Sequence, residues 1–90
     1  VTPSDQRPRP SRLNTTMAYL IERYGLRLTM EQLAETLGWS VGTLHNKLAR
    51  GELGLPTYVD GKLRFADVRD VSDYLDRKRA EAQEAIGSAA

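Results

Sequence analysis

A run of polar side chains between residues 40 and 50 has the residue types that proteins use to read the edges of DNA bases. The amide of Asn46 can pair with adenine through two hydrogen bonds, and Thr43 or His45 can make single hydrogen bonds or touch a thymine methyl group. Cations in the same run suit phosphate oxygens, or a guanine if they reach one. The candidate DNA-contacting residues here are Ser40, Gly42, Thr43, His45, Asn46, Lys47 and Arg50.

A second group of cations belongs to a predicted β-hairpin. Residues 55–59 and 62–65 have the character of strands, and Asp60-Gly61 between them is a strong signal for a two-residue turn. Pro56 restricts the first strand to an edge position. Lys62 and Arg64 alternate with Leu63 and Phe65, so an inward-facing apolar pair would make the two cations project together toward phosphates.

Residues 1–13 are predicted to form a disordered arm. The first twelve residues contain three prolines and no regularly spaced apolar residues, so they bury too little surface to offset the entropy of the chain. The arginines of this arm could enter a minor groove, although basic tails more often only keep a chain solvated, and we favour that second role. They are Arg7, Arg9 and Arg12.

Two helices are expected before the polar run. Asn14 can cap a helix over residues 15–24, and Gly25 provides its end. This first helix has an apolar stripe that we expect to pack on the domain, made of Met17, Leu20, Ile21 and Tyr24. Thr29-Met-Glu-Gln32 is a capping-box pattern and begins a second helix over residues 30–37.

The polar run itself follows a tight turn. Gly38 can adopt the left-handed conformation that ends the second helix, and Ser40 can cap a third helix over residues 41–50. Trp39, between them, is expected to fill space in the core. The apolar residues of the third helix that share a face are Val41, Leu44 and Leu48.

A last helix is predicted over residues 67–84, with acidic residues in its first turns, where the helix dipole favours them. Its inward-facing residues are expected to be Val68, Val71, Tyr74, Leu75 and Ala82. One domain would therefore span residues 14–84, and residues 85–90 are expected to fray.

Composition narrows the function classes. The chain has 90 residues, no cysteine, one histidine and a net charge of +1, so we expect neither a disulfide nor a metal site, and no cofactor. Residues 40–65 carry four basic and two acidic side chains, whereas residues 66–90 carry four and six, which suggests that one face meets an anion. The sequence contains no glycine-flanked nucleophile turn, no pair of carboxylates in an apolar setting and no phosphate-binding glycine loop. It therefore does not predict an enzyme. We expect a cytoplasmic protein with no membrane partner and no small-molecule ligand.

The order of these motifs resembles that of the MerR-like winged-helix excisionases and the related AlpA-type phage regulators. The resemblance covers about residues 29–76 and rests on Leu33-Ala-Glu-Thr-Leu-Gly-Trp-Ser40, Thr43-Leu44, Arg50-Gly51-Glu52-Leu53, Pro56, Gly61 and Arg64-Phe65. It implies a mainly α fold with a small β-hairpin, a winged helix-turn-helix of about four helices and a two-stranded wing. In this family the helix at residues 43–50 enters the major groove, the Gly61 hairpin forms the wing, and the helix at 68–75 packs behind them.

The resemblance also implies a phage or mobile-element protein that binds double-stranded DNA. Such a protein either bends DNA so that an integrase carries out excision, or switches transcription at a promoter; the integrase and cooperatively bound copies of the protein would be its partners. A protein-interaction module that uses Tyr74 and the acidic last helix, without DNA, is the remaining alternative. The chain departs from the family at Gly42, His45 and Asn46, where members often carry arginines, and in its added helix at 15–24.

Overall fold

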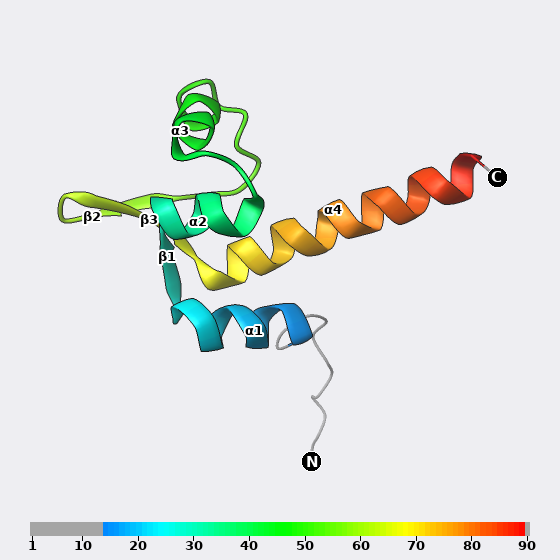
Figure 1. Cartoon of the computed structure of the whole chain (residues 1–90), viewed down its shortest axis with the longest axis horizontal. Coiled ribbons are helices and arrows are strands. Elements are labelled where there is room, and N and C mark those ends of the chain that lie inside the picture. Colours follow the sequence, from blue (N-terminus) through cyan, green and yellow to red (C-terminus); the bar gives the residue numbers. More distant parts are fainter. Residues whose placement is uncertain (1–13, 90) are drawn as a thin grey trace, which may run out of the picture.

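The computed structural model describes residues 14–89 and contains four helices and one three-stranded antiparallel sheet (Figure 1). The predicted arm at residues 1–13 lies outside this part of the chain. The mainly helical fold with a small antiparallel sheet is confirmed. In chain order the elements are α1 (Thr15–Tyr24), β1 (Arg27–Thr29), α2 (Met30–Leu37), α3 (Val41–Ala49), β2 (Tyr58–Asp60), β3 (Leu63–Asp67) and α4 (Val68–Ala89).

The first two helices begin where their capping residues predict. The Asn14 side chain accepts a hydrogen bond from the Met17 amide at 2.8 Å, which satisfies one of the free N–H groups at the start of α1. At the start of α2 the Thr29 hydroxyl accepts from the Gln32 amide at 3.2 Å, while the Gln32 side chain accepts from the Thr29 amide at 3.0 Å. The predicted capping box is therefore confirmed.

The sheet contains a strand that the sequence did not predict. β1 pairs antiparallel with β3, which lies between β1 and β2 in the sheet. Between α1 and α2 this strand has only three residues, so it is too short for a periodic pattern to reveal it. β1 forms because it can pair with the edge of β3. This pairing connects the segment that follows α1 to the hairpin.

The hairpin differs from its prediction in both its first strand and its turn. β2 begins at Tyr58 instead of residue 55, because Leu55 belongs to the core cluster and Pro56 has no N–H for the ladder. Asp60 pairs with Leu63, so the turn is Gly61-Lys62 and not Asp60-Gly61. β2 is an edge strand of the sheet, as predicted.

Of the two apolar residues in this strand, Phe65 is buried and Leu63 is 61% exposed, so the inward-facing pair that would make Lys62 and Arg64 project together does not form. Alternate residues of a strand point to opposite faces, and Ala66 is the residue of β3 that joins the core cluster. Arg64 therefore shares the core side of the strand with Ala66, while Leu63 and Phe65 lie on the other side. Phe65 is buried there beneath the guanidinium of Arg27, 3.8 Å from its ring centroid.

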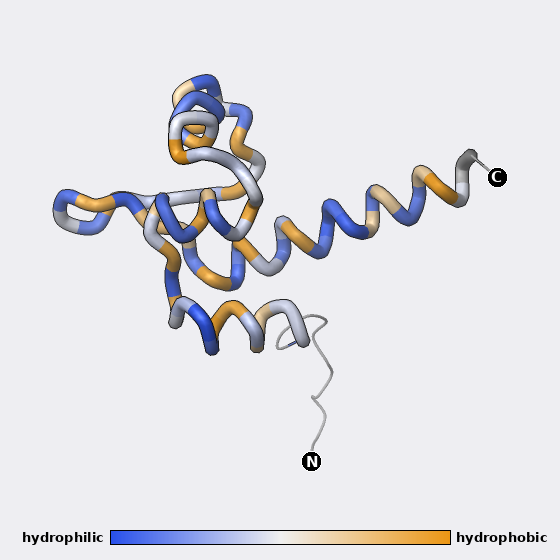
Figure 2. Tube along the Cα trace, viewed as in Figure 1, coloured by the Kyte–Doolittle hydropathy of each residue, from blue (hydrophilic) through white to orange (hydrophobic). Residues whose placement is uncertain are grey.

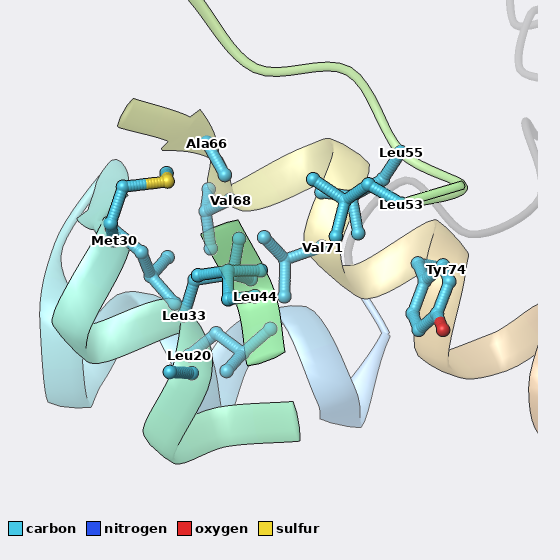
Figure 3. Packing of buried hydrophobic residues seen from close by; sticks show 12 residues of the cluster. Leu20, Met30, Leu33, Leu44, Leu53, Leu55, Ala66, Val68, Val71 and Tyr74 are labelled. Carbon is cyan, nitrogen blue, oxygen red and sulfur yellow. The ribbon is translucent and has the colours of Figure 1, made fainter. Parts of the chain in front are cut away.

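The core lies where α1, α2, α3, the sheet and the first turns of α4 meet (Figure 3). From α1, Met17 and Leu20 are buried, and Ile21 and Tyr24 pack against the cluster, so the apolar stripe of the added helix packs on the domain as predicted. The cluster consists of Leu20, Leu28, Met30, Leu33, Ala34, Leu44, Leu53, Leu55, Ala66, Val68, Val71 and Tyr74.

A polar contact beside the core also ties α1 to α4. The Asn14 side chain donates to Asp76 at 2.8 Å, and the Thr16 hydroxyl donates to the other oxygen of Asp76 at 3.3 Å. Ser72 is fully buried, and its hydroxyl lies 3.5 Å from the side-chain oxygen of Asn14. Because the capping residue of α1 is itself held by α4, the two helices keep one relative position.

α4 is longer than the sequence predicted. It begins after Asp67, which accepts hydrogen bonds from the backbone and side chain of Arg69 at 2.8 Å; the side-chain bond is the larger reason that the pKa of Asp67 is lowered. The helix continues to Ala89 instead of ending at residue 84. Ala82 is exposed and not inward-facing, because the second half of α4 extends beyond the other elements (Figure 1). Hydrophilic and hydrophobic positions follow one another along this half of the helix (Figure 2). No helix within residues 14–89 is long and apolar enough to cross a membrane.

We expect the core role of α1 to be measurable by a pair of neighbouring substitutions. Leu20→Ala should lower the free energy of unfolding by about 2–5 kcal/mol, because it removes buried methyl groups and leaves a cavity. Tyr19→Ala is the control, since Tyr19 is 61% exposed on the same helix and its loss should change stability by less than about 0.5 kcal/mol. Urea unfolding measures both, and equal losses would contradict the packing of α1.

Candidate nucleic-acid interface

α3 is mounted on α2 through a three-residue connection. Gly38 ends α2 with φ +77°, a left-handed conformation that glycine adopts without steric cost. The Ser40 hydroxyl then accepts a hydrogen bond from the Thr43 amide at 3.1 Å and begins α3, as predicted. Leu44 is the buried residue of α3 and enters the core cluster beside α2. The helix ends at Ala49, one residue before the predicted end.

Most of the predicted base-reading side chains lie on the exposed surface of α3. Those that are exposed are Ser40, Gly42, Thr43, His45, Asn46 and Arg50, and Lys47 is half-buried. Val41, which we expected to face inward, is 39% exposed because it lies at the first position of the helix, beyond the edge of the contact with α2. One face of α3, with small and polar residues, is therefore open to a partner.

Lys47 lies on a different flank of α3 from His45. The Lys47 ammonium is 5.1 Å from the ring centroid of Trp39, which is itself half-buried against the core cluster as predicted. Residues two apart on a helix point about 160° away from each other around the axis. Lys47 therefore covers Trp39 on one side of α3, and His45 points toward the other side.

His45 faces a groove between α3, the start of α2 and the hairpin turn. The groove has a volume of about 340 Å³ and includes residues from all three elements. Its lining residues are Thr29, Met30, Glu31, His45, Lys62, Leu63 and Arg64. The structure thus brings together one residue of the polar helix and both predicted hairpin cations, which are 17 and 19 residues further along the chain.

The two hairpin cations have different surroundings. Lys62 is exposed in the turn. The guanidinium of Arg64 is held by the Thr57 hydroxyl, to which it donates at 2.8 Å, and the side chain is only partly exposed. Lys62 is consequently free to follow a phosphate, while Arg64 has a fixed position beside it.

Acidic side chains limit the positive charge of this region. Glu31 lines the groove itself, and Glu52 lies 3.7 Å from Arg50 beyond the end of α3. Asp60 is paired with Arg27 at 2.8 Å; this hydrogen bond is the largest reason that the pKa of Arg27 is raised. The arrangement suits hydrogen bonding to a polar surface together with a few phosphate contacts.

No family model, curated protein or solved structure matches this chain. The Ser40 hydroxyl donates to the Thr43 hydroxyl at 3.0 Å while accepting from its amide, so it serves as a helix cap. Within residues 14–89 no three His, Asp or Glu side chains cluster in a way that could hold a metal ion.

Sequence reasoning missed part of the groove. The sequence predicts Thr29 and Glu31 only as the start of a helix, and it does not predict that Leu63 lines a groove. The capping box was the available signal for Thr29 and Glu31, because it marks the start of α2, and this end of α2 lies beside α3. The arginines of the arm, Arg7, Arg9 and Arg12, lie outside the described residues.

The turn between α2 and α3 generates a prediction with opposite signs at two glycines. Gly38→Ala should lower the free energy of unfolding by about 1–2 kcal/mol, because an alanine is strained at a positive φ. Gly42→Ala should raise it by about 0.5–1 kcal/mol, since Gly42 is helical and its nearest neighbour to an added Cβ is Ser40 Oγ at 3.9 Å. Thermal and urea unfolding check this, and a destabilising Gly42→Ala would show that α3 is built differently.

Proposed function

We propose that this chain is a winged helix-turn-helix protein that binds double-stranded DNA, with α3 in the major groove and the β2–β3 hairpin as the wing. The observation that carries the proposal is the groove in which His45 of α3 meets Lys62 and Arg64 of the hairpin. A major groove of B-DNA is wide enough for one helix, and a neighbouring hairpin then lies over the phosphate backbone.

The exposed surface of α3 supports readout of bases in addition to backbone binding. Asn46 and Gly42 lie on the side of the helix away from Leu44, and the absence of a side chain at Gly42 permits close approach. An amide can pair with adenine through two hydrogen bonds, whereas backbone contacts carry no sequence information. Asn46 is therefore proposed as the main base-reading residue.

The same geometry favours a binding protein over an enzyme. Ser40 is occupied as a helix cap, and His45 faces cations of the hairpin across the groove. For the biological role we propose an excisionase that bends DNA for an integrase, the role that the motif resemblance implies. A small transcription regulator of phage or mobile-element genes is the second candidate, and selection of bound sequences from a random pool separates them, because integrase-arm sites and promoter operators differ in arrangement.

Asn46→Ala should cost about 1–3 kcal/mol on the preferred duplex and relax the preference at one base position, with little change on a scrambled duplex. Gln83→Ala is the matched control, because Gln83 is an exposed amide on the distant half of α4. Titrations by fluorescence anisotropy on both duplexes measure the effect. Equal weakening on both duplexes by Asn46→Ala would mean that α3 does not read bases at this position.

Lys62→Ala should weaken binding to all duplexes alike and reduce the slope of log affinity against log salt by about 1, because one phosphate contact is lost. Arg79→Ala removes the same charge from an exposed site on α4 and should leave the slope unchanged. Glu31→Gln should strengthen binding, since it removes a carboxylate from the groove. A salt series measures all three, and identical slopes for Lys62→Ala and the wild type would place the hairpin away from DNA.

A further inference from the structure

The tip of the hairpin exposes two large aliphatic side chains. Val59 is 57% exposed and Leu63 is 61% exposed, on either side of the Gly61-Lys62 turn. Other apolar residues of the same sheet, Leu28 and Ala66, are fully buried. Figure 2 shows hydrophobic and hydrophilic positions alternating along the projecting hairpin.

The hairpin that carries them is braced from outside the core. The Arg27 guanidinium of β1 donates to the Asp60 carboxylate at 2.8 Å and stacks 3.8 Å above the ring centroid of Phe65. The Tyr58 ring lies beside Phe65, with 6.3 Å between the centroids. Three strands are thus connected over one face of the sheet, so Leu63 is presented to solvent by an element with a defined position.

The charges at the tip favour an approach to DNA. Asp60 is the acidic residue at the turn, and its carboxylate is compensated by Arg27. Lys62, directly before Leu63, is an exposed cation. Leu63 also borders the groove that His45 and Arg64 line, and its side chain lies on the opposite face of β3 from Arg64, at the end of the strand nearest the turn.

We propose that the hairpin tip enters the minor groove beside the major groove occupied by α3, and that Leu63 acts as an apolar wedge at one base step. This inference rests on the proposed DNA binding and goes beyond it, because phosphate contact alone does not require an apolar tip. Leucine is among the side chains that partly unstack a base step from the minor groove, and such wedges kink the duplex by about 20–90°. Lys62 would hold the adjacent phosphate while Leu63 opens the step.

Leu63 is the better wedge of the two aliphatic residues. Its side chain is longer than that of Val59, and Leu63 lies next to the turn, at the border of the groove between the hairpin and α3. A wedge in this position gives the protein a means of bending DNA that uses neither a second domain nor a second copy. It also gives specificity at positions that α3 does not touch, because flexible pyrimidine–purine steps cost less to unstack.

The test measures unstacking and bending on the duplex that the wild-type protein selects. 2-Aminopurine is placed at successive positions beside the α3 contact, and end-to-end fluorescence energy transfer reports the bend. The wild type should raise 2-aminopurine emission at one step and shorten the end-to-end distance. Leu63→Ala should abolish the emission increase and most of the bend, while the salt slope stays unchanged because no cation is lost. Leu63→Met, which keeps a long apolar side chain, should retain both signals.

The matched control is Leu26→Ala. Leu26 is 73% exposed and lines a different groove, with Met17 and Ile21 of α1, so its loss should leave both signals as in the wild type. Circular dichroism melts verify that each variant is folded, which the exposure of both leucines predicts.

The outcomes separate the two proposals. If the wild type binds no duplex, the proposed function fails and the wedge fails with it. If it binds duplex without unstacking any step, or if Leu63→Ala unstacks and bends DNA as the wild type does, the wedge alone is overturned. Sedimentation velocity of the free protein tests a third outcome. If the wild type is a dimer and Leu63→Ala is a monomer, the hairpin tip serves self-association, and the wedge is overturned.

Discussion

The burial of Leu44 is the contact on which the rest of the structure depends. α3 has nine residues, too few to be stable as an isolated helix in water, so it exists because this side chain enters the core beside α2. Gly38 and Ser40 set the direction in which the helix leaves that contact. Since a single fully buried side chain secures α3, the opposite surface of the helix can remain small and polar. The candidate interface is this exposed polar surface of α3.

The hairpin is secured by a different kind of interaction. Ala66 is the hairpin residue that joins the core cluster. Phe65 is covered instead by Arg27 from the neighbouring strand, and the same guanidinium reaches Asp60. Stacking of an arginine on an aromatic ring, combined with an ion pair, stabilises an exposed sheet face without a second layer of structure. This leaves the other side of β3, with Arg64, turned toward the groove that His45 lines. β1, a strand of three residues, thus positions the hairpin relative to α3.

The net charge of the molecule and the positive charge of the groove are both small. The net charge is +1, and the groove combines two cations with the carboxylate of Glu31. The proposed DNA-binding surface would gain less from non-specific phosphate attraction than a strongly basic one, so hydrogen bonds from α3 and the shape of the duplex would contribute a larger share of its selectivity. The second half of α4 extends beyond the core, and its residues 77–87 are exposed.

Local rules determined the helices from the sequence alone. Asn14, the Thr29 and Gln32 capping box, Gly38 and Ser40 act within three or four residues, so the starts of α1, α2 and α3 were predicted correctly, as was the exposure of the polar residues of α3. The tertiary structure decided what depends on distant partners: β1 forms because β3 pairs with it, and Phe65 is buried because Arg27 and Tyr58 from the neighbouring strands pack against it. Strand pairing also places the turn at Gly61-Lys62 instead of at the predicted Asp60-Gly61. In this register Leu63 is exposed and lines the same groove as His45. Strand pairing and stacking across a sheet join residues tens of positions apart, and a period-two pattern within one short strand cannot tell which of its faces another part of the chain will cover.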